Sequence, residues 1–383
     1  MTKSALFVSQ TAEKGGAELF MLDLLAHGPR DWSGCFFEDG PAAKDLVAAD
    51  RQPIVLSSGT NLSAVRREAS ALQMLGAAGT VWSLARELAR TGKDYRAICA
   101  NSQKALFVSA LATRMIGRPL VWVLHDIITD PAFSRNTRRA AVLFANLFAT
   151  RVVANSKATA QAFADAGGRS ERVRIVYCGF DPAAHPQGTS AAGQALRRRF
   201  GLGDGPVVGL FGRLTPWKGQ HVLFKALATL PAVQAVIVGS AMFGQDAYEA
   251  EVRQLATSEG LDDRVRFTGF QRDIADIMAG VDIVLHTSTH AEPFGRVVVE
   301  GMLAGRPVIA TKGGGVNEII TEDCDGLLVP PSDPAALAAA IARLLTDRDF
   351  AARIAGAGRV TAVERFNISK TCADMAAVLD ELS

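Results

Sequence analysis

The sequence predicts an α/β protein built from two doubly wound, Rossmann-like parallel sheets. Short apolar runs rich in β-branched residues alternate with longer runs of helical spacing, and this alternation occurs twice along the chain. A stretch rich in Pro, Gly, Ala and Ser, residues 181–205, separates the two sets. The length of 383 residues also fits two or three domains of roughly 150 residues. Because ligands of such sheets bind beyond the carboxyl ends of the strands, we expect two domains that face one another across a cleft.

Each half has six runs that are typical of buried strands. In the first half they are Ala5–Ser9, Ile54–Ser57, Ala97–Ala100, Leu120–Leu124, Arg151–Ala154 and Val173–Tyr177. In the second half they are Val207–Phe211, Ala235–Val238, Val265–Thr268, Ile283–Leu285, Val308–Ala310 and Leu327–Val329. Helical spacing is clearest at Ala17–Ala26 and Val81–Arg90, and the chain is expected to be helical after Asp333 and Pro334, a helix N-cap and first-turn proline.

These patterns give four segments. We expect an N-terminal domain over residues 1–180 and a linker over 181–205 that contains one short basic helix. A C-terminal domain over 206–360 follows, and residues 361–383 are expected to form a helix that returns to the N-terminal domain.

Charge is distributed unevenly between the halves. Residues 1–180 hold 22 Lys/Arg and 15 Asp/Glu, a net charge of +7, and residues 181–383 hold 19 and 24, a net charge of −5. The basic half favours an anionic acceptor, a phospholipid surface or nucleic acid, but an uneven, solvated surface explains it equally well. Nucleic acid is the weakest of these partners, because no basic strip is interleaved with aromatic residues.

The cysteines and the apolar runs indicate a reducing compartment. Five cysteines are an odd number and include no C-x-x-C spacing, which argues against a disulfide framework or a zinc site. The N-terminus enters a strand without signal-peptide features. The longest apolar run, Ala140–Ala149, is half of the ~20 residues that span a bilayer. We expect a cytoplasmic protein, soluble or bound at the inner face of the membrane.

Two glutamates eight positions apart are the most specific feature of the second half. Glu292 and Glu300 bound the stretch Glu-Pro-Phe-Gly-Arg-Val-Val-Val-Glu after an expected strand. This pattern predicts a tight loop and then a helix that begins near Gly295, with one acid on the loop and one on the helix. Backbone N–H groups at the helix start would lie between the acids, at the positive end of the helix dipole. Such a site suits a ligand with many hydroxyls and an anionic end.

A second candidate site follows the strand Val207–Phe211. A glycine turn at Gly212 and a short loop deliver Arg213 and Lys218 to the start of a helix near Gly219. Two cations and a helix N-terminus that converge on one point are typical of a diphosphate site. A solvated loop would explain either cation alone, but the nearby glutamate pair favours the diphosphate site.

Together these motifs resemble the donor-binding half of retaining glycosyltransferases of the GT-B fold, family 4. The resemblance rests on Gly212-Arg213, Lys218-Gly219, the Glu292 to Glu300 stretch, Gly313-Gly-Gly-Val-Asn-Glu318 and Gly326-Leu-Leu-Val329. In the first half it extends to Gly15-Gly-Ala-Glu18, His125-Asp126, Asn155-Ser156-Lys157 and Tyr177-Cys-Gly-Phe-Asp181. It therefore covers nearly the whole chain.

The resemblance implies a role for each residue. Arg213 and Lys218 would neutralise the diphosphate of a nucleotide sugar, Glu300 would hold the ribose hydroxyls, and Glu292 would hold the sugar. The other residues expected to bind the donor are Gly15, Gly16, Gly212, Pro293, Phe294, Gly295 and Arg296. Because the bond to the diphosphate breaks through an oxocarbenium-like state, stabilisation must fall on the leaving phosphate. No metal and no other cofactor is then required.

The first half is expected to contribute to the sugar and acceptor. Gly15 and Gly16 form either a tight βα turn or a close approach to a phosphate, and Glu18 is expected to serve the first helical turn. His125 follows a strand and would ordinarily be structural. The resemblance places it beside the sugar and acceptor, and it assigns Asp126 and Ser156 to acceptor binding.

Two features have competing interpretations. Asp323-Cys-Asp325 and Asp347-Arg-Asp349 match the Asp-x-Asp of metal-dependent sugar transferases, but both are interpreted as surface turns. The segment 134–151 has a basic start and an apolar helix. A helix packed on the N-terminal sheet is favoured there over contact with a membrane.

We expect a retaining, metal-independent transfer of a sugar from a nucleotide diphosphate sugar to a hydroxyl of a glycan or lipid-linked acceptor. An epimerase or a phosphorylase on the same scaffold is one alternative. A catalytically silent protein that binds sugar nucleotides is another, but the set of Arg213, Lys218, Glu292 and Glu300 argues against it.

Overall fold

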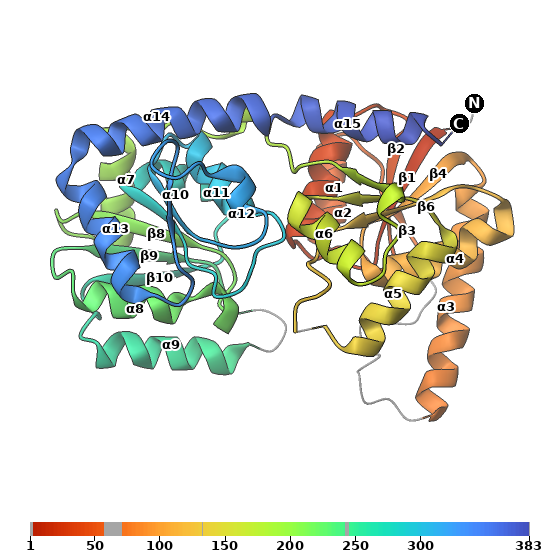
Figure 1. Cartoon of the computed structure of the whole chain (residues 1–383), viewed down its shortest axis with the longest axis horizontal. Coiled ribbons are helices and arrows are strands. Elements are labelled where there is room, and N and C mark those ends of the chain that lie inside the picture. The colour runs from red at the N-terminus through yellow and green to blue at the C-terminus, as the bar shows by residue number, and fades with distance from the viewer. Residues whose placement is uncertain (1–2, 57–70, 132, 242–244, 383) are drawn as a thin grey trace. The chain divides into compact units, whose positions relative to one another are not determined.

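The computed structural model describes residues 3–56, 71–131, 133–241 and 245–382. The chain divides into two compact units. The first unit comprises residues 1–179 and 368–383, and the second comprises residues 180–367. Each unit is a parallel sheet with helices around it (Figure 1).

The first unit contains a seven-stranded parallel sheet with the order β3-β2-β1-β4-β5-β6-β7. Its strands are β1 (Lys3–Ser9), β2 (Trp32–Phe36), β3 (Ile54–Val55), β4 (Tyr95–Ala100), β5 (Leu120–Leu124), β6 (Ala149–Ala154) and β7 (Val173–Ile175). Its helices are α1 (Gly16–His27), α2 (Pro41–Ala48), α3 (Ala71–Gly92), α4 (Gln103–Ile116), α5 (Arg135–Phe148), α6 (Lys157–Asp165) and α15 (Ile368–Asp380).

The second unit contains a six-stranded parallel sheet with the order β10-β9-β8-β11-β12-β13. Its strands are β8 (Val207–Phe211), β9 (Gln234–Val238), β10 (Val265–Gly269), β11 (Ile283–His286), β12 (Val308–Thr311) and β13 (Leu327–Val329). Its helices are α7 (Ser190–Phe200), α8 (Gln220–Ala228), α9 (Asp246–Ser258), α10 (Ile274–Gly280), α11 (Arg296–Leu303), α12 (Val316–Ile319), α13 (Pro334–Thr346) and α14 (Arg348–Arg365). The predicted fold class, two doubly wound parallel sheets, is confirmed.

Each sheet is buried on both faces, as the continuous apolar runs of its strands require. All five residues of β5 and all five of β8 are buried. In the second unit, Phe224 of α8 and Ile341 of α13 pack in one core with Leu285 of β11. In the first unit, Leu106 of α4 packs in a core with Trp122 of β5. These two cores fix the strand ends from which the candidate site residues project.

Strand β2 is absent from the sequence-based assignment. Its sequence, Trp-Ser-Gly-Cys-Phe, lacks the β-branched residues that mark the other strands. Packing explains the glycine at its centre, because a Cβ on Gly34 would lie 2.8 Å from Leu46 and 2.9 Å from Leu25. The expected strand Ile54–Ser57 is shorter, at Ile54–Val55, and Ser57 lies outside the described residues.

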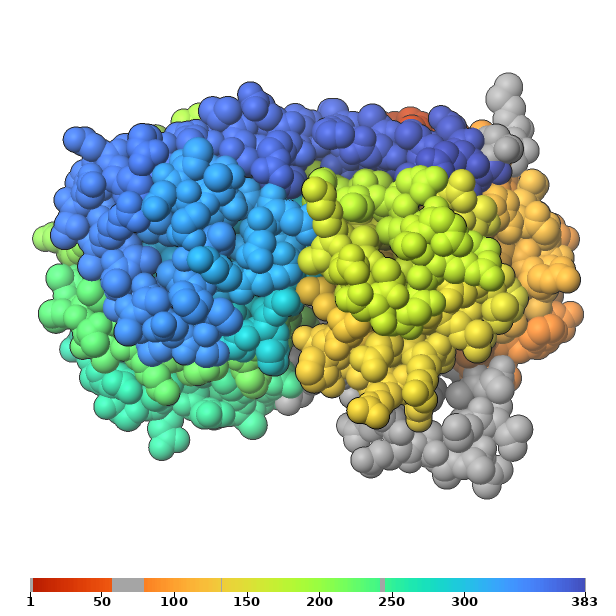
Figure 2. All heavy atoms as spheres, viewed as in Figure 1, coloured from red at the N-terminus to blue at the C-terminus, as the bar shows by residue number. Residues whose placement is uncertain are grey.

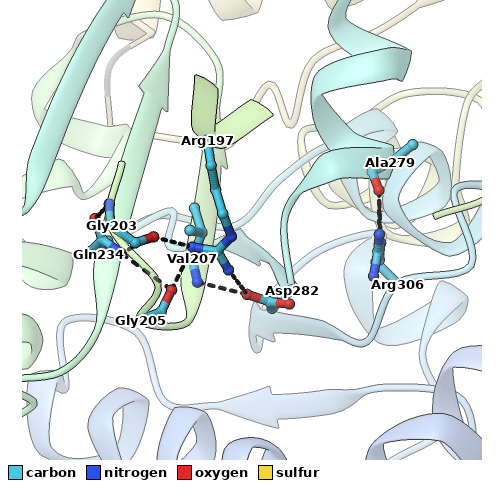
Figure 3. A network of polar contacts seen from close by, with 8 residues as sticks. All are labelled: Arg197, Gly203, Gly205, Val207, Gln234, Ala279, Asp282 and Arg306. Carbon is cyan, nitrogen blue, oxygen red and sulfur yellow. Dashed lines mark hydrogen bonds and ion pairs between the residues drawn. The ribbon is translucent and has the colours of Figure 1, made fainter. Parts of the chain in front are cut away.

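Residues 181–205 belong to the second unit and do not form a separate linker. Arg197 of α7 donates to the carbonyls of Gly203 and Gly205, at 2.6 and 2.7 Å, and pairs with Asp282 at 3.4 Å. The Asp282 carboxylate also accepts from the N–H of Val207, the first residue of β8 (Figure 3). This network fastens α7 to the amino ends of the strands, so the Gly- and Ala-rich composition of the segment does not reflect a free connection.

The C-terminal helix returns to the first unit, as predicted, but it begins later than residue 361. Helix α14 continues to Arg365 within the second unit, and α15 begins at Ile368. Helix α15 packs against α1, and the hydroxyl of Thr371 donates to the carbonyl of Tyr177 at 3.0 Å. Further along, Glu381 accepts from Arg151 of β6 and Arg174 of β7 at 2.8 and 2.9 Å. No helix among the described residues is long and apolar enough to cross a membrane.

Candidate functional site

The candidate residues of the second half lie on two loops at one point of the second sheet. The strand order reverses between β8 and β11, and the loops that follow these strands leave from neighbouring carboxyl ends. Ligands of doubly wound sheets bind at such a switch point. The loop after β8 carries Arg213 and Lys218, and the loop after β11 carries Glu292.

The two loops touch at a position where only glycine fits. Gly219 has a φ of 72°, and a Cβ there would lie 2.0 Å from the carbonyl oxygen of Thr287. The Thr287 hydroxyl donates to the carbonyl of Lys218 at 2.8 Å. Helix α8 begins at Gln220, immediately after this contact. Lys218 is therefore held at the start of the helix, as the sequence predicts.

Lys218 and Glu292 form an ion pair with each other. The Nζ of Lys218 contacts Oε1 of Glu292, and the two side chains are only 17% and 8% exposed. The same Nζ lies 4.2 Å from the ring centroid of Trp217, which adds a cation–π contact. The cation expected at the diphosphate and the acid expected at the sugar are thus joined in one buried cluster.

Two residues that the sequence did not single out complete this cluster. The hydroxyl of Ser288 donates to Oε1 of Glu292 at 2.8 Å, and Nε2 of His286 lies 3.2 Å from the same oxygen. His286 is the last residue of β11 and is 4% exposed. The hydroxyl of Thr311, at the end of β12, donates to the carbonyl of Ser288 at 2.7 Å. The backbone and the hydroxyl of Ser288 are therefore both fixed.

The electrostatics of Glu292 follow from these partners. Burial alone would raise its pKa, but the charge of Lys218 and the contact with His286 outweigh burial and hold the pKa well below the usual range of a glutamate. Glu292 is consequently a carboxylate throughout the neutral range. As a carboxylate it accepts hydrogen bonds and donates none, which fits a group that binds hydroxyls.

The glycines of residues 313–315 support the loop that carries Glu292. Glu292 and Gly314 form a parallel β-bridge, and the N–H of Gly315 donates to the carbonyl of Glu292 at 2.8 Å. Gly314 has a φ of 63°, and a Cβ there would lie 1.9 Å from the carbonyl oxygen of Glu292. This glycine run has a structural reason, which is the close approach of two backbones.

Glu300 lies on α11, with its side chain 18% exposed. Its Oε1 is 3.6 Å from Nη2 of Arg296, one turn earlier on the same helix. The guanidinium of Arg296 also lies 4.5 Å from the ring centroid of Phe180. Helix α11 begins at Arg296, after Gly295 with a φ of 106°, so the predicted loop and helix positions of the two glutamates agree with the structure.

The remaining predicted residues of the loops after β8 and β11 differ in how far they are buried. Arg213 is exposed, and its carbonyl accepts from the side chain of Gln220 at 2.9 Å. Gly212 has a φ of 139°, which L-residues rarely adopt, and it allows the chain to turn after β8. In the loop after β11, Phe294 is buried against Phe366, with ring centroids 5.6 Å apart, whereas Pro293 is half-buried.

In the first unit, the glycine pair begins helix α1. Gly15 is the N-cap and Gly16 the first helical residue. A Cβ on Gly15 would lie 2.8 Å from Oε2 of Glu18, whereas a Cβ on Gly16 would meet nothing within 4 Å. Glu18 is 7% exposed and accepts a hydrogen bond from the hydroxyl of Ser9 at 2.9 Å. Burial raises the pKa of Glu18, and the negative charge of Asp126 acts in the same direction.

His125 occupies the end of β5, close to the start of α1. Its Nε2 is 2.9 Å from Oδ1 of Asn101, and Nδ2 of Asn101 donates to the carbonyl of Ala17 at 2.9 Å. Because a carboxamide oxygen only accepts, Nε2 of His125 carries the proton in this contact. The ring also packs edge-on against Phe20, with centroids 5.2 Å apart. Asn101, a residue that the sequence did not single out, therefore orients the predicted histidine.

Ser156 has a local role. It is the N-cap of α6, and its hydroxyl accepts from the N–H of Thr159 and donates to the Thr159 hydroxyl, both at 3.0 Å. The side chain is fully buried. Ser156 therefore caps this helix, and its expected role in acceptor binding stays a prediction.

The Asp-x-Asp sequences have structural partners. Residues 323–325 form a turn, as expected, with Asp323 and Cys324 exposed. The Asp325 side chain differs, because it is 5% exposed and accepts from the N–H of Thr321 and the hydroxyl of Thr361, at 2.7 and 2.9 Å. Asp347 caps α14. Within residues 3–56, 71–131, 133–241 and 245–382, no group of three His, Cys, Asp or Glu could hold a metal ion.

Comparison with known proteins identifies two family matches. Residues 45–184 match the model described as Glycosyltransferase Family 4, and residues 194–361 match the model described as Glycosyl transferases group 1. The Anabaena protein HepE, whose crystal structure was solved in complex with UDP-glucose, is 38% identical. That match covers 99% of this chain and 100% of HepE, with a TM-score of 0.90.

Two curated relatives agree with this assignment. The α-D-kanosaminyltransferase of Streptomyces kanamyceticus is 29% identical over 76% of this chain and 78% of its own length. The lipopolysaccharide core biosynthesis glycosyltransferase LpsE of Rhizobium meliloti is 35% identical over 43% of this chain, and the match spans about half of that relative, 46%. The chain therefore belongs to the glycosyltransferases of the GT-B fold.

Proposed function

We propose that this protein transfers a sugar, with retention at the anomeric carbon, from a nucleoside diphosphate sugar to a hydroxyl of a glycan or lipid-linked acceptor. The observation that carries the proposal is the buried Lys218–Glu292 pair at the carboxyl ends of β8 and β11. It puts a cation suited to a phosphate and an acid suited to sugar hydroxyls at one switch point. The likeness to HepE, a protein that binds UDP-glucose, supports a nucleotide sugar as the donor.

The charges in the second unit support a reaction driven by stabilisation of the leaving group. In our proposal the bond between the anomeric carbon and the diphosphate oxygen breaks, and the acceptor oxygen bonds to the same carbon on the same face. The acceptor proton passes to the departing phosphate oxygen. Lys218 and Arg213 stabilise the negative charge that develops on the diphosphate.

Glu292 is proposed to bind the sugar rather than to act as a covalent nucleophile. Its Oε1 is already engaged by Lys218, Ser288 and His286, and its lowered pKa makes it a weak base. Glu300, which is more exposed, is proposed to hold the ribose hydroxyls. Both acids then serve one donor molecule.

We also propose that the reaction needs no metal ion. The diphosphate would be neutralised by Lys218 and Arg213 together with the start of α8. Activity that survives dialysis against a chelator at full rate is the expected result. Activity that is lost on chelation and restored by a divalent cation would refute this part of the proposal.

The first unit is proposed to select the acceptor. Its candidate residues for the acceptor are Asp126, after β5, and Ser156, at the start of α6, and His125 is proposed to lie beside the sugar. Gly15 and Gly16, at the start of α1, are proposed to approach the donor. A cytoplasmic location also stays a prediction.

Helix α5 supports contact with a membrane. Its Leu143 and Leu147 are 55% and 62% exposed, and Arg135 and Arg139 continue the same exposed stripe at intervals of four residues. Atoms of α5 reach the surface of the first unit (Figure 2). The opposite side of the helix, at Ala141, is buried in the core. We expect binding to vesicles of anionic phospholipid that Leu143→Gln with Leu147→Gln weakens; equal binding by this variant would contradict it.

The decisive test of the donor is thermal stabilisation by a panel of nucleotide sugars. A ligand at 100 times its dissociation constant adds about 2.7 kcal/mol to the free energy of unfolding. We expect one nucleotide sugar of the panel, with UDP-glucose and GDP-mannose included, to stabilise the wild type. Stabilisation by none of them would refute the proposed donor class.

The alternative activities predict different products. An epimerase would convert the nucleotide sugar without releasing nucleotide, and a silent binding protein would leave it unchanged. In our proposal, free nucleoside diphosphate accumulates when an acceptor is supplied. Conversion of the sugar without an acceptor and without release of nucleotide would favour the epimerase.

A further inference from the structure

Three contacts in the second unit converge on one oxygen atom. Lys218, Ser288 and His286 all reach Oε1 of Glu292. Lys218 is also the cation assigned above to the diphosphate of the donor. A diphosphate therefore competes with Glu292 for the Lys218 ammonium, a flexible point charge on a four-carbon stem.

Loss of Lys218 would leave Glu292 as a carboxylate in a buried place. An unpaired buried charge is unfavourable unless other groups hydrogen-bond to it. Ser288 and His286 provide such bonds to the oxygen that Lys218 releases. We propose that Ser288 and His286 are positioning residues that hold the Glu292 carboxylate in place when Lys218 turns to the diphosphate of the donor. The inference rests on the proposed function.

The proton positions in this cluster follow from the contacts. The Ser288 hydroxyl has one proton, which it donates to Glu292, so in its 3.2 Å contact with His286 it accepts. Nε2 of His286 is consequently the donor to both oxygens. Thr311 uses its own proton on the carbonyl of Ser288 at 2.7 Å and lies 3.5 Å from Nδ1 of His286. Ser288 and His286 thus both donate to the acid, and Thr311 holds the backbone of Ser288.

Because all three contacts use Oε1, we assign the sugar hydroxyl to Oε2 of Glu292. Ser288 and His286 act through Glu292 in two ways, by lowering the cost of releasing Lys218 and by holding the carboxylate against the sugar. The first effect is common to a nucleoside diphosphate and a nucleotide sugar, so it cancels when the two affinities are compared. The measurable quantity is the ratio of two dissociation constants, that of the nucleoside diphosphate divided by that of the nucleotide sugar. UDP and UDP-glucose are the probes, or GDP and GDP-mannose if the thermal panel selects guanine.

Ser288→Ala removes one donor to the carboxylate. We expect the ratio to fall about 10-fold, because a hydrogen bond to a charged group is lost. The affinity for the nucleoside diphosphate alone should also fall, because its diphosphate withdraws Lys218 from the carboxylate, but it should fall by less than the affinity for the nucleotide sugar. The matched control is Ser109→Ala, since the Ser109 hydroxyl is equally buried and has no hydrogen-bond partner among the residues that the structure describes. This control should leave the ratio unchanged.

Two further variants separate a positioning role from a structural one. His286→Gln keeps an N–H near the position of Nε2 and should preserve the ratio, whereas His286→Phe should lower it. In the Glu292→Ala background, Ser288→Ala should have no further effect, because the carboxylate through which it acts is gone. The two His286 variants carry the same test if Ser288→Ala does not fold.

The outcomes distinguish this inference from the proposed function. A wild type that binds no nucleotide refutes the proposed function. A wild type that binds and transfers sugar, but whose ratio is unaffected by Ser288→Ala and His286→Phe, overturns the positioning role alone. An equal loss from Ser288→Ala with and without Glu292 also overturns it.

Discussion

The carboxyl ends of the two sheets each carry a buried glutamate, and the two glutamates have opposite electrostatics. Glu292 in the second unit is 7% exposed and paired with Lys218, and its pKa is lowered. Glu18 in the first unit is equally buried, but it is held by the hydroxyl of Ser9 and lies in the field of Asp126, and its pKa is raised. Equal burial therefore gives a permanent anion where a cation is present and a readily protonated acid where none is.

The opposite pKa shifts of Glu292 and Glu18 indicate different roles for the two acids. An acid that shares a cation with an anionic ligand responds to that ligand, and this suits the part of the protein that would bind the donor. An acid that holds the turn at Gly15 by hydrogen bonds alone shapes the backbone. The contrast predicts that changes at Glu292 and Lys218 affect ligand binding most, and that changes at Glu18 and Ser9 affect the pH dependence of stability.

Lys218→Ala should have the largest effect. Transfer should be abolished, because the leaving diphosphate loses its buried cation. The variant should also lose about 3 kcal/mol of stability at pH 7, because the buried charge of Glu292 loses its cation and keeps only its contacts with Ser288 and His286. The measurements are the initial rate of transfer and the free energy of unfolding in urea.

The control for this substitution is Lys225→Ala on α8, where the side chain is exposed. It should leave both quantities within experimental error. The double variant Lys218→Met with Glu292→Gln removes both charges and should recover stability without recovering transfer. Full turnover by Lys218→Ala would contradict the role of this lysine at the diphosphate.

Glu300→Gln should have an intermediate effect that is confined to binding. Loss of a charged acceptor for ribose hydroxyls should weaken the nucleoside diphosphate about 10-fold. Stability should change little, because the side chain is more exposed than that of Glu292 and its contact with Arg296 is long, at 3.6 Å. Isothermal titration checks the affinity, with Glu251→Gln on the exposed side of α9 as the control. An unchanged dissociation constant would count against the ribose role.

The fold was predictable because turn residues, such as glycine and proline, and continuous apolar runs are local features of the sequence. The expected strands Leu120–Leu124, Val207–Phe211 and Leu327–Val329 match β5, β8 and β13 residue for residue. Local sequence patterns do not predict the structure of a segment whose place depends on tertiary contacts. Residues 181–205 resemble a linker in composition, and contacts such as that of Arg197 with Asp282 and that of the Gly188 N–H with the carbonyl of Ala304 show that they belong to the second unit.

The candidate site was predictable in its charges but not in their pairing. Glycine turns and cation spacing located Lys218 and Glu292, but sequence gives no distance between residues 74 positions apart. Ser288 and His286 carry no motif, because a histidine that ends a strand and a serine two residues later are common at buried strand ends. At Ser156 the structure adds a local role, the N-cap of α6, to a motif position that the resemblance assigns to the acceptor.

Ser9→Ala should have a smaller effect, on stability alone. It removes the hydroxyl that donates to Glu18 at 2.9 Å and leaves a buried carboxyl with one donor fewer. The expected cost is about 1 kcal/mol at pH 7. It should shrink toward acidic pH, because a protonated Glu18 needs fewer donors. Ser109→Ala, with an equally buried hydroxyl for which the described part of the chain offers no hydrogen-bond partner, is the control for the loss of the oxygen atom itself.

Glu18→Gln should have the smallest effect on the free energy of unfolding. The sign of this effect as pH changes tests the raised pKa of Glu18. The folded-state pKa of Glu18 is raised above 4.5, so its contribution to stability is fully present below that pH and is lost as pH rises through the folded-state value. A glutamine does not titrate, so the variant should gain on the wild type between pH 4.5 and pH 8. Equilibrium unfolding in urea at several pH values measures this difference.

The matching variant Glu292→Gln should give the opposite slope. The folded-state pKa of Glu292 is depressed, so its contribution is present above 4.5 and is lost as pH falls through the folded-state value. Near neutral pH the wild type should be more stable than Glu292→Gln and less stable than Glu18→Gln. Both differences in the free energy of unfolding should become smaller on acidification. Two buried glutamates whose difference curves have the same sign would refute the assignment of one as an anion and the other as a readily protonated acid.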